Sequence, residues 1–151
     1  MAKDKSKEIQ NINFQIKVVD LVKSFLAPPV KQFTTVPNFN FTINLEQKLD
    51  HTNKSLIVIT NVEITTTDDL DIILGSASVA CVFSIENYYE VVTIDKNKHA
   101  HIKDVTSNVL NSISISTTRG VLSQVFRGTI LHHAILPVLD PKSFKNAHLS
   151  E

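Results

Sequence analysis

Four histidines lie where their spacing could support chemistry, and metal binding is the chemistry it suggests first. His99 and His101 are two residues apart, so on a strand both side chains would share one face and could bind a metal ion. His132 and His133 could join them. Zinc sites usually take three or four closely spaced ligands, often with cysteine, and Cys81 is remote. We therefore interpret these histidines as solvated loop residues and predict no metal site.

Two further patterns could be read as catalytic or ion-binding sites. Asp68, Asp69 and Asp71 could form a cation loop, but the glycine and the final glutamate of an EF-hand are missing, so an acidic turn is predicted. Serines are common, yet no Gly-x-Ser-x-Gly elbow is present. The chain has only three glycines and no loop that could cradle a phosphate. The sequence therefore predicts neither an enzyme nor a cofactor.

Two arginines, Arg119 and Arg127, lie eight residues apart, which places them on roughly one face of a helix. They could pair with Asp140 or Glu86 across an interface, and a simple surface pair is slightly favoured over that. Arg127 and Gly128 also fit the end of a helix, because arginine complements the negative end of the helix dipole and glycine suits the position after it.

Charge and composition exclude several classes of partner. Fifteen basic and fifteen acidic side chains give a net charge of zero, without the clustered lysines and arginines that bind nucleic acid. No stretch approaches the ~20 apolar residues that span a bilayer. Residues 1–10 are polar, lack the apolar core of a signal peptide and are predicted to be a disordered tail. The single cysteine fits a small buried hydrophobe in a reducing compartment. We predict a cytoplasmic protein with one domain over residues 11–151.

The elements that must position any site are strands in the first half of the chain. Alternating apolar and polar residues predict a sheet of consecutive strands joined by short turns, which favours antiparallel pairing; the strands cover residues 11–23, 39–49, 55–67 and 71–85. Residues 25–38 contain Pro28, Pro29 and Pro37, so they are predicted to form an extended connection. This connection is unusually apolar for a loop.

The second half of the chain should supply helices to cover one face of the sheet. Between residues 102 and 124, apolar residues recur at helical spacing. Residues 112–118, however, are serine, threonine and isoleucine, which are mediocre to poor helix formers, and their alternation also fits a strand. The residues alone leave helix and strand about equally favoured here.

Several short blocks at wide spacing carry a resemblance to a known family. The blocks are Phe14-Gln15-Ile16, Ser24-Phe25-Leu26-Ala27-Pro28, Phe83-Ser84-Ile85, Arg127-Gly128-Thr129 and Leu136-Pro137-Val138, with Phe144 beyond. Each block is short, but their order and gaps from Phe14 to Phe144 are similar to those of the SecB family of export chaperones. The resemblance implies an α+β fold: a four-stranded antiparallel sheet with a crossover connection, one long helix over residues 102–126 and a short C-terminal helix.

The resemblance also implies a function. SecB-like proteins are holdases that bind unfolded or pre-export polypeptides in apolar grooves, without a cofactor, and assemble as homotetrameric dimers of dimers. A holdase must expose apolar surface, because unfolded chains offer apolar segments. The residues that we predict to bind polypeptide are Phe25, Phe33, Val36, Phe39, Ile73, Leu136 and Phe144. The competing interpretation is that these side chains simply fill the core.

Departures from the family pattern keep two alternatives open. Family members that deliver cargo to a SecA-type motor carry acidic residues where this chain has Val22, Leu26 and Ser76, so motor docking by charge is not predicted. SecB-like proteins outside the export route resemble this chain there, and some serve a single partner such as an antitoxin. A dedicated chaperone or adaptor is therefore the first alternative. A small apolar-ligand-binding protein or enzyme is the second.

Overall fold

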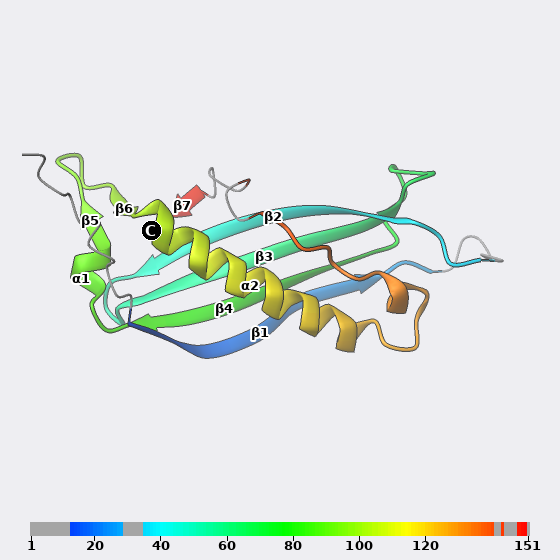
Figure 1. Ribbon diagram of the computed structural model, residues 1–151, viewed down its shortest axis with the longest axis horizontal. Coiled ribbons are helices and arrows are strands. Elements are labelled where there is room, and N and C mark those ends of the chain that lie inside the picture. The colour runs from blue at the N-terminus through cyan, green and yellow to red at the C-terminus, as the bar shows by residue number, and fades with distance from the viewer. Residues whose placement is uncertain (1–12, 29–34, 141–142, 144–147, 151) are drawn as a thin grey trace, which may run out of the picture.

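The computed structural model describes residues 13–28, 35–140, 143 and 148–150 (Figure 1). Its main feature is a sheet of four long strands: β1 (Phe14–Leu26), β2 (Phe39–Asp50), β3 (Ser55–Thr66) and β4 (Gly75–Ile85). Strands β2, β3 and β4 pair antiparallel in succession, whereas β1 pairs antiparallel with β4. The chain must therefore cross from one edge of the sheet to the other between β1 and β2. The predicted antiparallel sheet with a crossover connection is confirmed.

A fifth, short strand extends the sheet beyond β2. Strand β7 (His148–Ser150) pairs parallel with Glu46–Lys48, giving the order β1-β4-β3-β2-β7. The short helix that the resemblance implies near Phe144 falls largely outside the described residues. The described short helical turn after the long helix comes earlier, as the 3-10 turn η1 (Ile130–His133).

Strand β1 does not keep a simple alternation. Its pairing with β4 shifts register between Ile16 and Val18 and again between Leu21 and Lys23. Such bulges add one residue to a strand and reverse the face of the residues that follow. As a result Ile16 faces the same side as Phe83, whereas Val18 lies opposite Val82 on the other side of the sheet.

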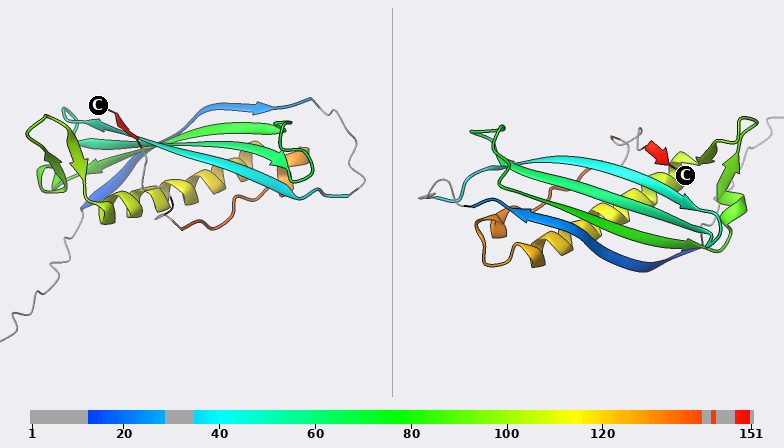
Figure 2. Two further views of the ribbon diagram at one scale, coloured as in Figure 1. Left: turned by 90° about the horizontal axis from the view of Figure 1, so that it is seen from above. Right: turned by 180° about the vertical axis from the view of Figure 1, so that it is seen from behind.

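Residues 104–125, for which the sequence favoured helix and strand about equally, form the long helix α2 (Asp104–Val125). It lies along one face of the sheet, and the other face has no described element over it (Figure 2). Leu110, Ile115 and Leu122 are buried against the sheet, so packing outweighs the weak helix propensity of the central residues. The hydroxyl groups of Ser114 and Thr118 donate to the carbonyls of the residues four before them, at 2.8 Å in each case.

The smaller elements lie at the two ends of the sheet, some before α2 in the chain and one after it. Before it come the short helix α1 (Tyr88–Val91) and a hairpin of β5 (Val92–Ile94) and β6 (Ala100–Ile102). After it, Gly128 adopts a left-handed backbone conformation with φ of +76°, as glycine readily does. No helix of the described residues is long and apolar enough to cross a membrane.

The core fills the space between α2 and the helix-facing side of β2, β3 and β4. Its largest buried side chains include Phe83, Leu56, Ile64 and Leu110, and Cys81 is fully buried among them. Burial raises the pKa of the Cys81 thiol, so the residue behaves as a small apolar side chain rather than as a nucleophile.

Candidate functional site: an apolar end of the sheet and an uncovered edge strand

Phe25, Val36 and Ile73, three of the predicted polypeptide-binding residues, lie at one end of the sheet. Three backbone hydrogen bonds tie the chain together there: Ala27 N to Leu74 O at 2.8 Å, Leu74 N to Ile64 O at 2.8 Å and Thr67 N to Asn38 O at 3.0 Å. The end of β1, the start of β2 and the β3–β4 loop therefore meet at the end of the sheet opposite the β5–β6 hairpin (Figure 1).

The side chains at this end remain open to solvent. Phe25 is 50% exposed, Val36 62% and Ile73 39%. The β3–β4 loop adds Leu70 and Ile72, which are exposed to a similar degree and which we did not predict from the sequence. We call the five residues Phe25, Val36, Leu70, Ile72 and Ile73 the apolar end. When several exposed apolar residues lie at one end of a folded protein, they often mark an interaction surface.

The remaining predicted binding residues have different positions. Phe39, at the start of β2, is partly buried and packs against the core. Leu136 is 1% exposed and belongs to the core itself, so its side chain does not line an open surface. Phe33 and Phe144 lie outside the described residues. The structure therefore places three of the predicted residues, with exposed side chains, on segments that meet at one end of the sheet, and it gives Leu136 a packing role.

A second exposed apolar surface runs along β1. On the helix-facing side, Ile16, Val19, Leu21 and Leu26 lie opposite the buried residues Phe83, Cys81, Val79 and Gly75 of β4. The four β1 side chains nevertheless stay 39–42% exposed. The cause is that α2 packs mainly against β3 and β4, so the edge strand β1 is covered less. We call Ile16, Val19, Leu21 and Leu26 the inner stripe.

The opposite face of the sheet is different in chemistry. A shallow hollow of about 320 Å³ lies there, lined mainly by polar side chains such as Lys23, Asn44, Glu63 and Ser78. Within it the Asn61 amide donates to Glu46 Oε1 at 2.9 Å and accepts from the Ser78 hydroxyl. This polar lining does not favour an apolar ligand, so the hollow gives no support to the ligand-binding alternative.

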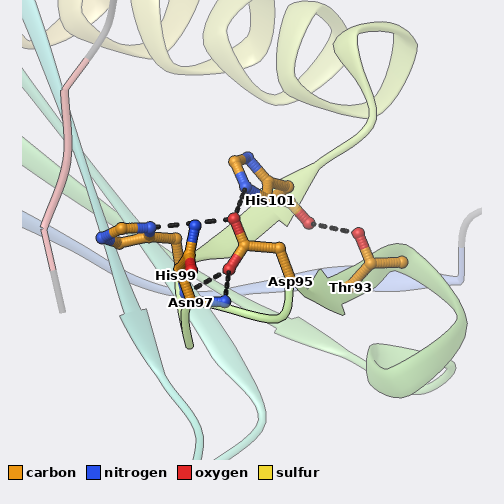
Figure 3. A network of polar contacts seen from close by, with 5 residues as sticks. All are labelled: Thr93, Asp95, Asn97, His99 and His101. Carbon is orange, nitrogen blue, oxygen red and sulfur yellow. Dashed lines mark hydrogen bonds and ion pairs between the residues drawn. The ribbon is translucent and has the colours of Figure 1, made fainter.

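His99 and His101 lie at the turn between β5 and β6, whereas His132 and His133 lie in η1 at the other end of α2. Asp95 Oδ1 accepts hydrogen bonds from the backbone N–H of His99 at 2.9 Å and of Asn97 at 2.8 Å, and Oδ2 lies 3.1 Å from His101 Nε2 (Figure 3). The His99 N–H, followed by the His101 ring, lowers the pKa of Asp95 to about 2. Asp95 thus closes the β5–β6 hairpin. No group of three or more potential ligands within the described residues is arranged to hold a metal ion.

Arg119 holds the chain that follows α2. Its Nε donates to the carbonyl of Leu136 at 2.6 Å, and its Nη2 donates to the carbonyl of Pro137 at 2.8 Å. The segment Ala134–Asp140 is thereby fixed against the helix. The sequence slightly favoured a simple surface arginine pair over pairing with Asp140 or Glu86 across an interface, whereas the described contacts of the Arg119 guanidinium are to backbone carbonyls. The sequence gives no signal for this role of Arg119, because every residue carries a backbone carbonyl that can accept a hydrogen bond.

Comparison with known proteins places this geometry in a known fold. No family model and no curated protein matches the sequence. Among solved structures, the chain is similar to the Mycobacterium tuberculosis Rv1957 SecB-like chaperone, solved in complex with a ChAD peptide from the Rv1956 HigA1 antitoxin. The two share 12% sequence identity and a TM-score of 0.50, and the match covers 84% of each chain. At this identity the likeness concerns the fold, and the SecB-like fold predicted from the spaced sequence blocks is confirmed.

Proposed function

We propose that this protein is a non-catalytic chaperone that holds non-native polypeptide at the apolar end. The observation that carries the proposal is the cluster of exposed apolar side chains from β1, the crossover and the β3–β4 loop, on a SecB-like fold. Burying one large apolar side chain contributes roughly 1.5–3 kcal/mol, so a few such contacts can retain an unfolded segment after its ordering cost is subtracted. Such binding needs neither nucleotide nor metal.

The inner stripe supports self-association as part of the same proposal. A row of four half-exposed aliphatic residues on an edge strand is poorly suited to water. An exposed, long, apolar edge strand is prone to pair with another chain. A second copy would cover both stripes at once in a symmetric contact. We propose that the protein is a homo-oligomer, with the dimer of dimers implied by the family as its assembled form.

We further propose that the protein works in the cytoplasm without docking to a SecA-type motor. Val22, Leu26 and Ser76 occupy the positions where acidic residues serve docking in the family, and none of them carries a charge. Val22 is 59% exposed and apolar, which is unsuited to a charge-based contact. A binding assay with a purified motor at low salt tests this point, and salt-sensitive binding would contradict it.

A dedicated partner is the second candidate function, and one observation favours it. The similar solved structure is that of a SecB-like chaperone bound to a peptide from an antitoxin. If this chain serves a single partner, it should protect that partner strongly and model unfolded proteins weakly. Aggregation assays with several unrelated clients separate the two: protection of all of them indicates a general holdase, protection of one alone indicates a dedicated chaperone, and protection of none supports neither.

The direct test of the proposed site compares two substitutions of exposed isoleucines. Ile73→Asp places a charge in the apolar end, whereas Ile94→Asp places one on β5, at the other end of the molecule. We expect Ile73→Asp to weaken suppression of the aggregation of a chemically unfolded protein and Ile94→Asp to leave it unchanged. Equal activity of both variants would show that polypeptide binds elsewhere.

A further inference from the structure

The edge of the sheet at β2 already holds a strand from the chain's own C-terminal region. Strand β7 pairs parallel with β2, matching His148 to Glu46, Leu149 to Gln47 and Ser150 to Lys48. It is the one parallel pairing in a described sheet that is otherwise antiparallel. The β2 edge is therefore able to accept an extended segment that is not part of the central sheet.

Most of this edge carries no strand in the described part of the chain. Strand β2 runs from Phe39 to Asp50 and pairs with β3 along its whole length, but β7 covers only Glu46–Lys48 on the other side. The backbone groups of Phe39–Leu45 that point away from β3 have no strand partner among the described residues. Unpaired edge groups of this kind form hydrogen bonds with an added strand.

The side chains beside the uncovered stretch suit an apolar polypeptide. Phe39, Phe41 and Ile43 alternate on the helix-facing side of β2 and are only partly buried, whereas Leu45 beyond them is buried. The segment that Arg119 fixes against α2 lies on the side of the helix nearer β2 (Figure 1). An added strand would thus meet backbone partners along β2 and apolar side chains beneath its inward residues.

We infer that the β2 edge from Phe39 to Lys48 binds an extended polypeptide segment by strand addition, and that β7 is a built-in competitor for this edge. The inference rests on the proposed chaperone function and names the backbone site through which it acts. Backbone pairing accepts any sequence, and the partly exposed apolar side chains of Phe39, Phe41 and Ile43 favour apolar residues at every second position.

The competition has a simple physical basis. Strand β7 has three residues, whereas a typical strand has about five to six residues. It therefore contributes few hydrogen bonds to the pairing with β2. Its advantage is that it belongs to the same chain and is always close to β2. A longer client segment forms more bonds along the same edge and displaces β7. If β7 occupies the edge for most of the time, removing it increases the apparent affinity for a client by about three- to tenfold.

The test removes backbone N–H donors of β7 by proline substitution within the chain of 151 residues. Successive residues of a strand alternate in direction, so Leu149→Pro combined with Ser150→Pro removes a donor toward β2 whichever residue supplies it. Leu149→Ala combined with Ser150→Ala keeps both donors and is the matched control. The probes are a soluble peptide of alternating valine and lysine and the same peptide with every backbone amide methylated, which leaves no N–H donor on either edge of the peptide. Affinity is measured by fluorescence anisotropy, and hydrogen exchange is followed at residues 39–48.

The outcomes distinguish failure of strand addition at β2 from failure of the proposed chaperone function. Strand addition predicts that the proline variant binds the unmodified peptide about three- to tenfold more tightly than the alanine control, that the peptide slows exchange at residues 39–45, and that methylation abolishes binding. Equal affinity of the two variants, or binding that survives methylation, overturns the inference. If the wild-type protein also fails to bind a chemically unfolded protein, the proposed function fails with it; if it binds that protein, only strand addition at β2 is rejected.

Discussion

At the scale of single residues, Gly75 occupies the tightest position between the sheet and the chain after α2. A Cβ atom there would clash with Cδ1 of Leu131, would lie 3.0 Å from the carbonyl oxygen of Phe25 and would lie 3.5 Å from Phe126. Leu131 is itself buried and cannot turn away. The side chain of Leu131 therefore approaches Gly75 too closely to leave room for a larger residue.

Gly75→Ala should therefore destabilise the protein by about 1–3 kcal/mol through overpacking, measured as the free energy of unfolding in denaturant. Gly120→Ala is the matched control, because nothing lies within 4 Å of a Cβ at that exposed helix position. There alanine should stabilise the protein by roughly 0.5–1 kcal/mol. Equal effects of the two substitutions would contradict the packing described around Gly75.

Asp95 makes the β5–β6 hairpin sensitive to acid. Its pKa of about 2 lies below the value of about 3.9 for an unfolded aspartate, so the unfolded chain binds more protons in this range. The stability that this carboxylate contributes is present above about pH 4 and is lost as the pH falls toward 2. Amide exchange in the hairpin should accelerate over this interval, and Asp95→Ala should remove the pH dependence. A dependence that survives in the variant would assign it to another group.

The site residues show what single-residue reasoning can achieve. Phe25, Val36 and Ile73 were predicted to bind polypeptide, which stays a prediction, and their side chains are exposed rather than packed in the core. Leu136 has the same apolar character, yet it is buried, because the fixing of its segment by Arg119 is invisible in the sequence. Ile72 was missed because the strand was predicted to begin at residue 71, whereas β4 begins at Gly75, and Leu70 was missed because it lay beside the predicted acidic turn.

At the scale of elements, the strands were predictable and their faces were not. Residues 39–49 and 55–67 were predicted as strands, and β2 and β3 match them within one residue at each end. In β1, the alternation through Ile16 and Val18 placed both on one face, which the register shift makes wrong. A bulge depends on pairing with β4, so local alternation cannot reveal it. The helix over residues 102–126 needed the family resemblance, because its serine-rich centre is stabilised by packing.

Arg119 joins α2 to the segment Ala134–Asp140, and its removal should loosen that segment. Arg119→Ala should cost about 1–2 kcal/mol in the free energy of unfolding and should increase hydrogen exchange of residues 134–140, because two carbonyls lose a charged donor. Arg127→Ala changes an exposed arginine just beyond the helix and is the control. If both variants exchange like the wild type, Arg119 does not hold the segment.

At the scale of the whole molecule, two neighbouring valines distinguish assembly from simple exposure. Val19 lies in the inner stripe and is 42% exposed; Val18 lies on the opposite face of the same strand and is 40% exposed. Val19→Asp should lower the mass measured by light scattering toward that of a monomer, because a second copy would have to bury the charge. Val18→Asp should leave the mass unchanged. A monomeric wild type, or equal masses of both variants, would contradict assembly through the inner stripe.

The whole molecule presents an exposed apolar end on a SecB-like fold, and we propose that this end binds non-native polypeptide. The most direct test is the mass of the protein in solution, with and without a reduced, unfolded client protein, measured by light scattering after size separation. We predict a stable oligomer that forms a defined complex with the unfolded client and ignores its folded form. A protein that remains at the same mass with either form of the client would contradict the claim.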